Sequence, residues 1–299
     1  MTQSLHYREL RCERTTGYAR LWPLARQEAL TVFRTKWGVA LYLFCLMPGI
    51  GRLIMLLIMF GVIQFGPVPL ANRFDGNMPA GMRHLNPNDA SFYLHSTLEV
   101  MPGMVFFMLL TTMIVARSVA RDRATNALEL YWTRGISPWG YLLAKWWGGY
   151  LITATMTVAL PLLLWVSACL LADDWTLFQQ TFAQFFIGLG AIAAVTGLWT
   201  MIGTFVSASA GSANGAMVIW CVLLVGTRAL GGILSGILKD PELQSCLSFW
   251  EAGGVIVRSI ADLPQQRTWL GGAVATMCVL FITTMLLARR RMRVKEALQ

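Results

Sequence analysis

The residues best placed to carry chemistry lie in one charged stretch near the middle of the sequence. Its charged and apolar members recur at the spacing of an amphipathic helix: Arg121, Asp122, Arg123, Leu128, Glu129, Tyr131 and Trp132. This pattern predicts a helix from Asp122 to Thr133, which Gly135 and Pro138 end. Such a helix would offer charges and an aromatic edge to a protein partner. The alternative interpretation is a solvated connector.

Two arginines lie inside long apolar stretches, Arg52 shortly after Pro48 and Arg228 in a later stretch. A guanidinium at bilayer depth is costly, so each arginine is a candidate for function. We expect the two to line the route of an anionic substrate group, such as a lipid phosphate or a carboxylate. In the alternative, both side chains reach toward the headgroups, with Arg228 directed to Glu99 or Glu251.

The sequence shows no pattern for catalysis or metal binding. His84 and His95 lack the short His-x-x-His spacing of a metal site, although acids flank them, and the six cysteines form no metal motif. The lone outer thiol of Cys246 is interpreted as a small buried residue, with a bridge between two copies as the alternative. The chain has four lysines and none follows a glycine, so it lacks the Gly-Lys pair of a P-loop. We therefore expect no catalytic residues, no metal and no cofactor in the chain itself.

Composition indicates which elements position these residues. The 299 residues are 56% hydrophobic and only 13% charged, far from the values of a soluble domain. Apolar runs near the roughly 20 residues needed to cross a bilayer predict an all-α polytopic membrane protein. The six predicted spans are Val39 to Phe65, Val100 to Ala116, Trp146 to Leu171, Phe182 to Val206, Gly215 to Leu238 and Thr268 to Ala288.

The basic residues orient these spans. Of the 24 Lys and Arg residues, 17 fall in the N-terminal tail, the second-to-third connection and the C-terminal tail. The positive-inside rule then places both termini in the cytoplasm and the protein in the inner membrane. The net charge of +9 follows from this topology and is no evidence for nucleic acid.

The predicted organisation has two parts. Residues 1–38 form a cytoplasmic tail with a basic amphipathic elbow helix, because Gly17 to Trp37 alternates apolar and basic residues up to the first span. Residues 39–299 form the six-helix domain, with a cytoplasmic coupling loop at 117–145 and outer loops at 66–99 and 239–267. Within the last loop, Leu247 to Ile260 is apolar enough to form short re-entrant or interfacial helices.

The loop at 117–145 resembles that of the permeases of type-two ABC exporters, which reads Glu-Arg-x-x-Gly-Thr-Leu-Glu, a Pro-Ile-Ser turn and a lysine before the third span. The matching positions here are Asp122, Arg123, Leu128-Glu129, Ile136-Ser137 and Lys145. The departures are Asn126-Ala127 in place of Gly-Thr, Gly135 at the proline position and a displaced Pro138.

The resemblance implies a function and an assembly. The chain would be the membrane subunit of an ABC exporter, forming the path and coupling through Arg121, Asp122, Arg123, Leu128, Glu129, Tyr131 and Trp132. The ATPase would be a separate subunit that holds ATP and Mg²⁺, and the permease would pair with a second copy or a paralogue in membrane lipid. Two alternatives are a membrane-embedded enzyme on lipid-linked substrates and a mechanical partner of an ABC ATPase that moves no cargo.

Overall fold

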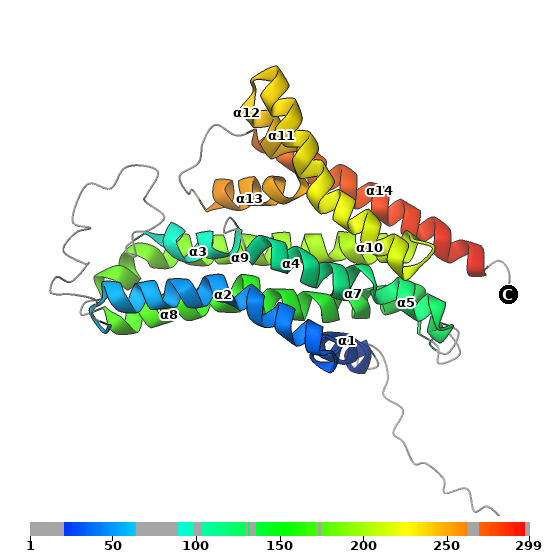
Figure 1. Cartoon of the computed structure of the whole chain (residues 1–299), viewed down its shortest axis with the longest axis horizontal. Coiled ribbons are helices and arrows are strands. Elements are labelled where there is room, and N and C mark those ends of the chain that lie inside the picture. The colour runs from blue at the N-terminus through cyan, green and yellow to red at the C-terminus, as the bar shows by residue number, and fades with distance from the viewer. Residues whose placement is uncertain are drawn as a thin grey trace, which may run out of the picture.

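The computed structural model describes residues 21–63, 89–98, 103–128, 131, 136–172, 175–261 and 269–296, and the described chain is helical without strands. Five helical segments are long and apolar enough to cross a membrane: Lys36–Met59, Pro138–Leu171, Thr176–Ser209, Ala213–Leu238 and Leu270–Arg291. They confirm five of the six predicted spans, with shifted ends. In Figure 1, α10, α11 and α14 are tilted away from the other long helices.

The predicted second span is described only in part. It consists of α4 (Gly103–Thr111) and a π-helical turn (Thr112–Ala116), preceded by α3 (Ala90–Leu98) and followed by α5 (Ser118–Ala124). The described part of this span is therefore too short to count among the five candidates.

Helix caps explain why the third span starts earlier than hydropathy indicates. Helix α7 (Pro138–Ala154) begins where Ser137 accepts a hydrogen bond from the Gly140 backbone N–H, with Pro138 in the first turn. A π turn (Thr155–Ala159) and α8 (Leu160–Leu171) continue it. As a result, Lys145, predicted at the entrance of the span, lies within α7.

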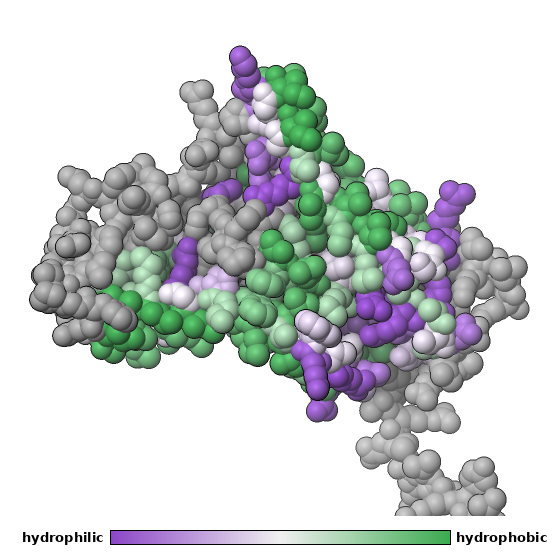
Figure 2. All heavy atoms as spheres, viewed as in Figure 1, coloured by the Kyte–Doolittle hydropathy of each residue, from purple (hydrophilic) through white to green (hydrophobic). Residues whose placement is uncertain are grey.

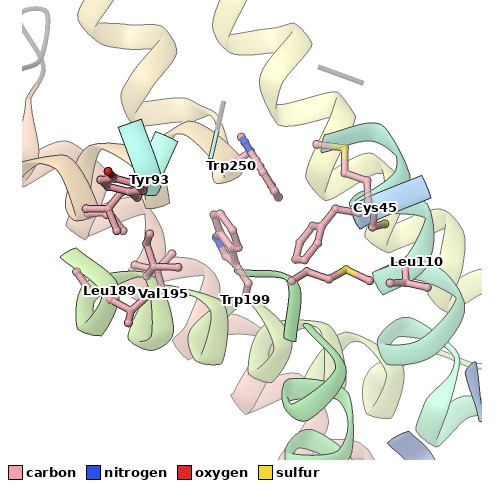
Figure 3. Close-up of a cluster of buried hydrophobic side chains, with 14 of the residues drawn as sticks. Cys45, Tyr93, Leu110, Leu189, Val195, Trp199 and Trp250 are labelled. Atoms are coloured by element: carbon pink, nitrogen blue, oxygen red, sulfur yellow. The ribbon is translucent and has the colours of Figure 1, made fainter. Parts of the chain in front are cut away.

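Helix α9 (Thr176–Ser209) forms the centre of the bundle. In its most apolar window 61% of the residues are buried, against 17–33% for the other four candidates. The Trp199 ring of α9 stacks on the Trp250 ring, with centroids 4.4 Å apart (Figure 3). The centroid of the Phe107 ring of α4 lies 5.5 Å from that of Trp250. The second half of the chain thereby shares one aromatic core with the first.

The connection after the fifth span contains two short helices, and the second of them covers most of the stretch Leu247 to Ile260 that was predicted to be helical. The fifth span runs through α10 (Ala213–Cys221), a π turn (Val222–Gly226) and α11 (Thr227–Leu238). Helices α12 (Pro241–Leu247) and α13 (Phe249–Ile260) follow, and α13 packs on α9 and on α14 (Leu270–Glu296). Cys246 is buried there, in agreement with the sequence interpretation.

The N-terminal segment forms α1 (Leu21–Leu30) and a 3-10 turn (Val32–Arg34) before α2 (Lys36–Met59). Pro23 lies in the first turn of α1, where proline is tolerated. Helix α1 packs along α7, near the end of the bundle that also holds α5 (Figure 1).

Apolar side chains remain exposed along much of the surface, and they form broad hydrophobic areas in Figure 2. Leu170, Val218 and Ile237 are among the most exposed. An apolar exterior of this kind suits a surface in contact with lipid.

Candidate functional site

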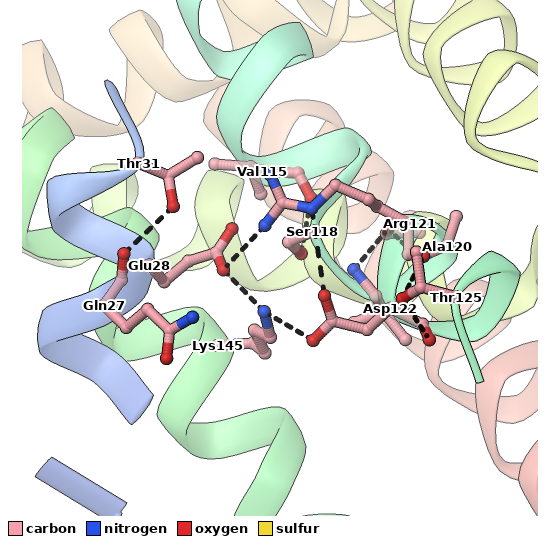
Figure 4. Close-up of polar contacts among 12 residues, drawn as sticks. Gln27, Glu28, Thr31, Val115, Ser118, Ala120, Arg121, Asp122, Thr125 and Lys145 are labelled. Carbon is pink, nitrogen blue, oxygen red and sulfur yellow. Dashed lines mark hydrogen bonds and ion pairs between the residues drawn. The ribbon is translucent and has the colours of Figure 1, made fainter. Parts of the chain in front are cut away.

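A buried ion network lies where α1, α5 and α7 meet (Figure 4). Glu28, Asp122 and Lys145 expose only 2%, 7% and 4% of their surface. The Lys145 Nζ atom lies 2.5 Å from Glu28 Oε2 and 2.8 Å from Asp122 Oδ2. Arg121, which is partly exposed, reaches Glu28 Oε2 at 3.4 Å and Asp122 Oδ1 at 3.8 Å. The two acids and two bases balance in charge, which is how a protein tolerates buried ions.

Two tyrosines complete the network. The Tyr141 hydroxyl donates a hydrogen bond of 2.9 Å to Asp122 Oδ2, and its ring lies beside that of Tyr131 with centroids 5.3 Å apart. Burial and the nearby Asp122 carboxylate raise the pKa of the Tyr131 phenol. Leu128 packs with Tyr141 in the same apolar cluster. Asp122 therefore has ionic partners and a phenol donor inside the protein.

Close packing of α1 on α7 brings Glu28 to Lys145. A Cβ atom at Gly148 would lie 2.5 Å from the Ala25 carbonyl oxygen and 2.7 Å from Glu28 Cβ. Only glycine allows this approach without a shift of one helix. Glu28 follows Leu24 and Ala25 on the face of α1 that packs inward.

We expect Gly148→Ala to destabilise the protein by about 1–3 kcal/mol, because the added methyl group forces α1 away from α7. Gly190→Ala is the matched control, since a Cβ atom there meets nothing within 4 Å. Thermal unfolding in detergent should show a lower midpoint for Gly148→Ala alone. Equal midpoints for both variants would contradict this packing.

On its other side, α5 contacts the end of α9. The Arg123 guanidinium donates to the carbonyl oxygens of Ala208 and Ala210, each at 2.7 Å. The hydroxyl of Ser207 accepts hydrogen bonds of 3.1 Å from the backbone N–H groups of Val119 and Ala120. Neighbouring residues of opposite charge, Asp122 and Arg123, thus hold α5 to different helices.

The predicted helix from Asp122 to Thr133 is wrong in its bounds. Helix α5 ends at Ala124, and Asn126 has a left-handed backbone with φ of 55°. Asparagine tolerates this conformation better than most residues, and it stands where the resembling motif has glycine. Glu129 and Trp132, two predicted coupling residues, lie outside the described residues.

The remaining predicted coupling residues face inward more than an amphipathic surface helix would require. Asp122 and Leu128 are buried, while Arg121, Arg123 and Tyr131 are half-buried. Among the described residues of this segment, Ala124 to Asn126 are the exposed ones. The charged side chains of Asp122 and Arg123 hold this turn to the bundle.

Sequence reasoning did not identify Glu28. The signal was present, because Glu28 is the acidic residue of the Gly17 to Trp37 segment and follows Leu24 and Ala25 at the spacing of one helix face. An acid on the apolar face of an amphipathic helix indicates a buried basic partner. That partner, Lys145, is 117 positions away in the sequence.

The two intramembrane arginines contact different elements. Arg52 of α2 donates to the Phe92 carbonyl oxygen of α3 and lies over the Phe92 ring, 5.4 Å from its centroid. Arg228 of α11 pairs with Glu251 of α13, Nε to Oε1 at 3.3 Å. The Gln244 amide donates to the same Glu251 oxygen at 3.0 Å. The structure thus contains the contact of Arg228 with Glu251 that the alternative names.

The described residues contain no group of three or more His, Cys, Asp or Glu side chains that could hold a metal ion. The ion network joins three helices, so we interpret it as a structural link between them. Together the fold and this link define a multi-pass helical membrane protein whose charged loop is fixed to the ends of its long helices.

Residues 80–251, more than half of the chain, match the family model described as ABC-2 family transporter protein, and the chain belongs to this family. Proteins of this family are typically non-enzymatic membrane components, and the family implies partnership with an ABC ATPase. A comparison with curated proteins finds no match to this chain.

Proposed function

We propose that this chain is the permease subunit of an ABC exporter, which forms the translocation path and couples to a separate ATPase subunit. The observation that carries the proposal is the exposed turn at Ala124 to Asn126, on a loop whose charged side chains bind α1, α7 and α9. A push on this turn is therefore passed on to the membrane helices. ATP and Mg²⁺ bind to the partner.

The proposal includes a topology of six crossings in the inner membrane. The additional crossing, the second along the chain, contains α4 and the π turn up to Ala116. Both termini are then cytoplasmic, as the 17 basic residues on that side favour. Residues 1–38 are the tail and elbow helix, and the coupling loop at 117–145 lies on the same side as α1, which agrees with the contact of Glu28 and Lys145.

The assembly we propose contains two permeases, as identical copies or paralogues, two ATPase subunits and surrounding lipid. The experiment that tests the function is ATP hydrolysis by the chain in lipid nanodiscs, alone and after isolation with its partner. We expect no hydrolysis by the isolated chain and vanadate-sensitive hydrolysis by the complex. Hydrolysis by the isolated chain would contradict the division of roles.

We also propose that Arg52 contacts an anionic group on the path, because its partner in the structure is a neutral carbonyl group and an aromatic ring. Arg228 already faces a carboxylate, so its part in the path is secondary. Phosphatidylglycerol is a suitable anionic probe.

We expect Arg52→Gln to lower the stimulation of ATP hydrolysis by phosphatidylglycerol at least fivefold, since the guanidinium supplies the charge-assisted hydrogen bonds. Arg228→Gln should have a smaller effect. The measurement compares nanodiscs of phosphatidylglycerol with nanodiscs of phosphatidylcholine. Full stimulation in both variants would refute a role for these arginines in the path.

A further inference from the structure

Two helix ends cap each other where α5 meets α9. The first N–H groups of a helix and its last carbonyl groups have no partners within the helix. Here Ser207 of α9 accepts from Val119 N and Ala120 N of α5, both at 3.1 Å. In return, Arg123 of α5 binds two carbonyl groups at the end of α9. Each helix thereby satisfies the unpaired groups of the other.

A third helix joins this contact. Arg291 of α14 donates to the Ser209 carbonyl oxygen at 2.5 Å, between the two carbonyl groups that Arg123 binds. Three successive carbonyl groups at the negative end of α9 are therefore held by two guanidinium groups from different helices. Burial and the charge of Arg291 lower the pKa of Arg123, which nevertheless stays protonated as arginines do.

The packing around these bonds is tight. Ala120, Ala210 and Ala216 form one buried cluster, from α5, the end of α9 and α10. Small side chains let the backbones approach closely, as they do at helix contacts in membranes. The two hydrogen bonds from the Arg123 guanidinium group to backbone oxygens also fix the orientation of α5 relative to α9, which a single hydrogen bond does not.

The opposite side of α5 is held differently. There the link to α1 and α7 runs through the ammonium group of Lys145, a compact charge that two carboxylates share. One oxygen of Glu28, Oε1, is buried and has no hydrogen-bond partner. The ammonium group of Lys145 lies between two carboxylates, with the unpaired Glu28 Oε1 beside it. It can therefore exchange one carboxylate oxygen for another at a small cost in free energy.

From this asymmetry we infer that Arg123 is a positioning residue that joins α5, α9 and α14 into one rigid unit, which moves against α1 and α7. The inference rests on the proposed function, because the ATPase supplies the push on α5. The contact of α5 with α1 and α7 is the one that changes during this movement. Arg123 and Ser207 thus determine which membrane helices move together with the ATPase.

Spin labels at three exposed positions test the unit. Thr125 lies at the end of α5, Asn214 lies in the first turn of α10 directly after α9, and Arg26 lies on α1. In nanodiscs the Thr125–Asn214 distance distribution should be narrow in the parent protein and at least twice as wide in Arg123→Met. Arg290→Met, at an exposed neighbour of Arg291, is the control and should stay narrow. A distribution in Arg123→Met as narrow as in the parent would overturn the inference.

If Arg123→Met fails to fold, Ser207→Ala removes the other half of the contact and should widen the same distribution. In the complex, ATP should change the Thr125–Arg26 distance and leave the Thr125–Asn214 distance within about 2 Å, roughly a third of the 5.4 Å pitch of a helical turn. An equal change in both pairs would overturn the rigid unit. A wider distribution in Arg123→Met without any ATP-dependent change would instead refute the proposed function and support the unit.

Discussion

Lys145→Met is expected to be the most damaging single substitution in the described part of the chain. It leaves Glu28 and Asp122 buried and facing each other without the ammonium group that lies within 2.8 Å of both. Removing one partner of a buried ion pair costs about 3–5 kcal/mol, because the remaining charge stays uncompensated. The thermal midpoint in detergent should fall sharply, with a lower yield of folded protein.

The matched control for this substitution is Lys239→Met, which removes the same charge from an exposed position. The double variant Glu28→Gln with Lys145→Met should recover part of the loss, because one of the two uncompensated carboxylates is gone. Arg121 and Tyr141 still contact Asp122 in that variant. A midpoint for Lys145→Met equal to that of Lys239→Met would show that the network contributes nothing to stability.

Thr125→Trp is expected to abolish coupling without unfolding the protein. Thr125 is exposed at the end of α5, and its hydroxyl bonds only with carbonyl groups of its own helix. A bulky ring at this turn obstructs a docked ATPase, while the buried network remains. ATP hydrolysis by the complex should fall at least tenfold, with an unchanged thermal midpoint.

Gln180→Trp is the control for the docking turn, because Gln180 is exposed in the first turns of α9, far along that helix from its contact with α5. The same ring at that position should leave hydrolysis within about twofold, a change below 1 kcal/mol. If Thr125→Trp hydrolyses ATP as well as Gln180→Trp does, the partner docks elsewhere.

Hydropathy was sufficient to predict most of the fold. Long apolar runs lose so much free energy by exposure to water that five spans could be predicted to within several residues, as could the helix that ends at Ile260. The ends of the spans were less certain, because hydrogen bonds of the capping residues determine where a helix begins. Ser137 and Pro138 start α7 eight positions before the predicted Trp146, and no apolar pattern reports such a cap.

The site was harder to predict, because local spacing does not report contacts between distant residues. Charges on an amphipathic pattern are expected to face water, yet Asp122 is buried by Lys145 and Tyr141, and Arg123 turns to the end of α9. The resemblance pointed to the segment 117–145, in which Asp122 and Lys145 form part of the buried network. The helix is interrupted at Asn126, which has a left-handed backbone. The resembling motif keeps glycine at this position, and glycine adopts that conformation without strain.

Co-purification tests most directly whether this chain works as the membrane subunit of an ATP-driven exporter. The tagged chain is isolated from its native membrane in nanodiscs, and the complex is weighed by native mass spectrometry. We predict two permeases with two copies of an ATPase polypeptide, and loss of the ATPase in Thr125→Trp but not in Gln180→Trp. A chain that is isolated without any nucleotide-binding protein, under conditions that preserve its fold, would contradict the account.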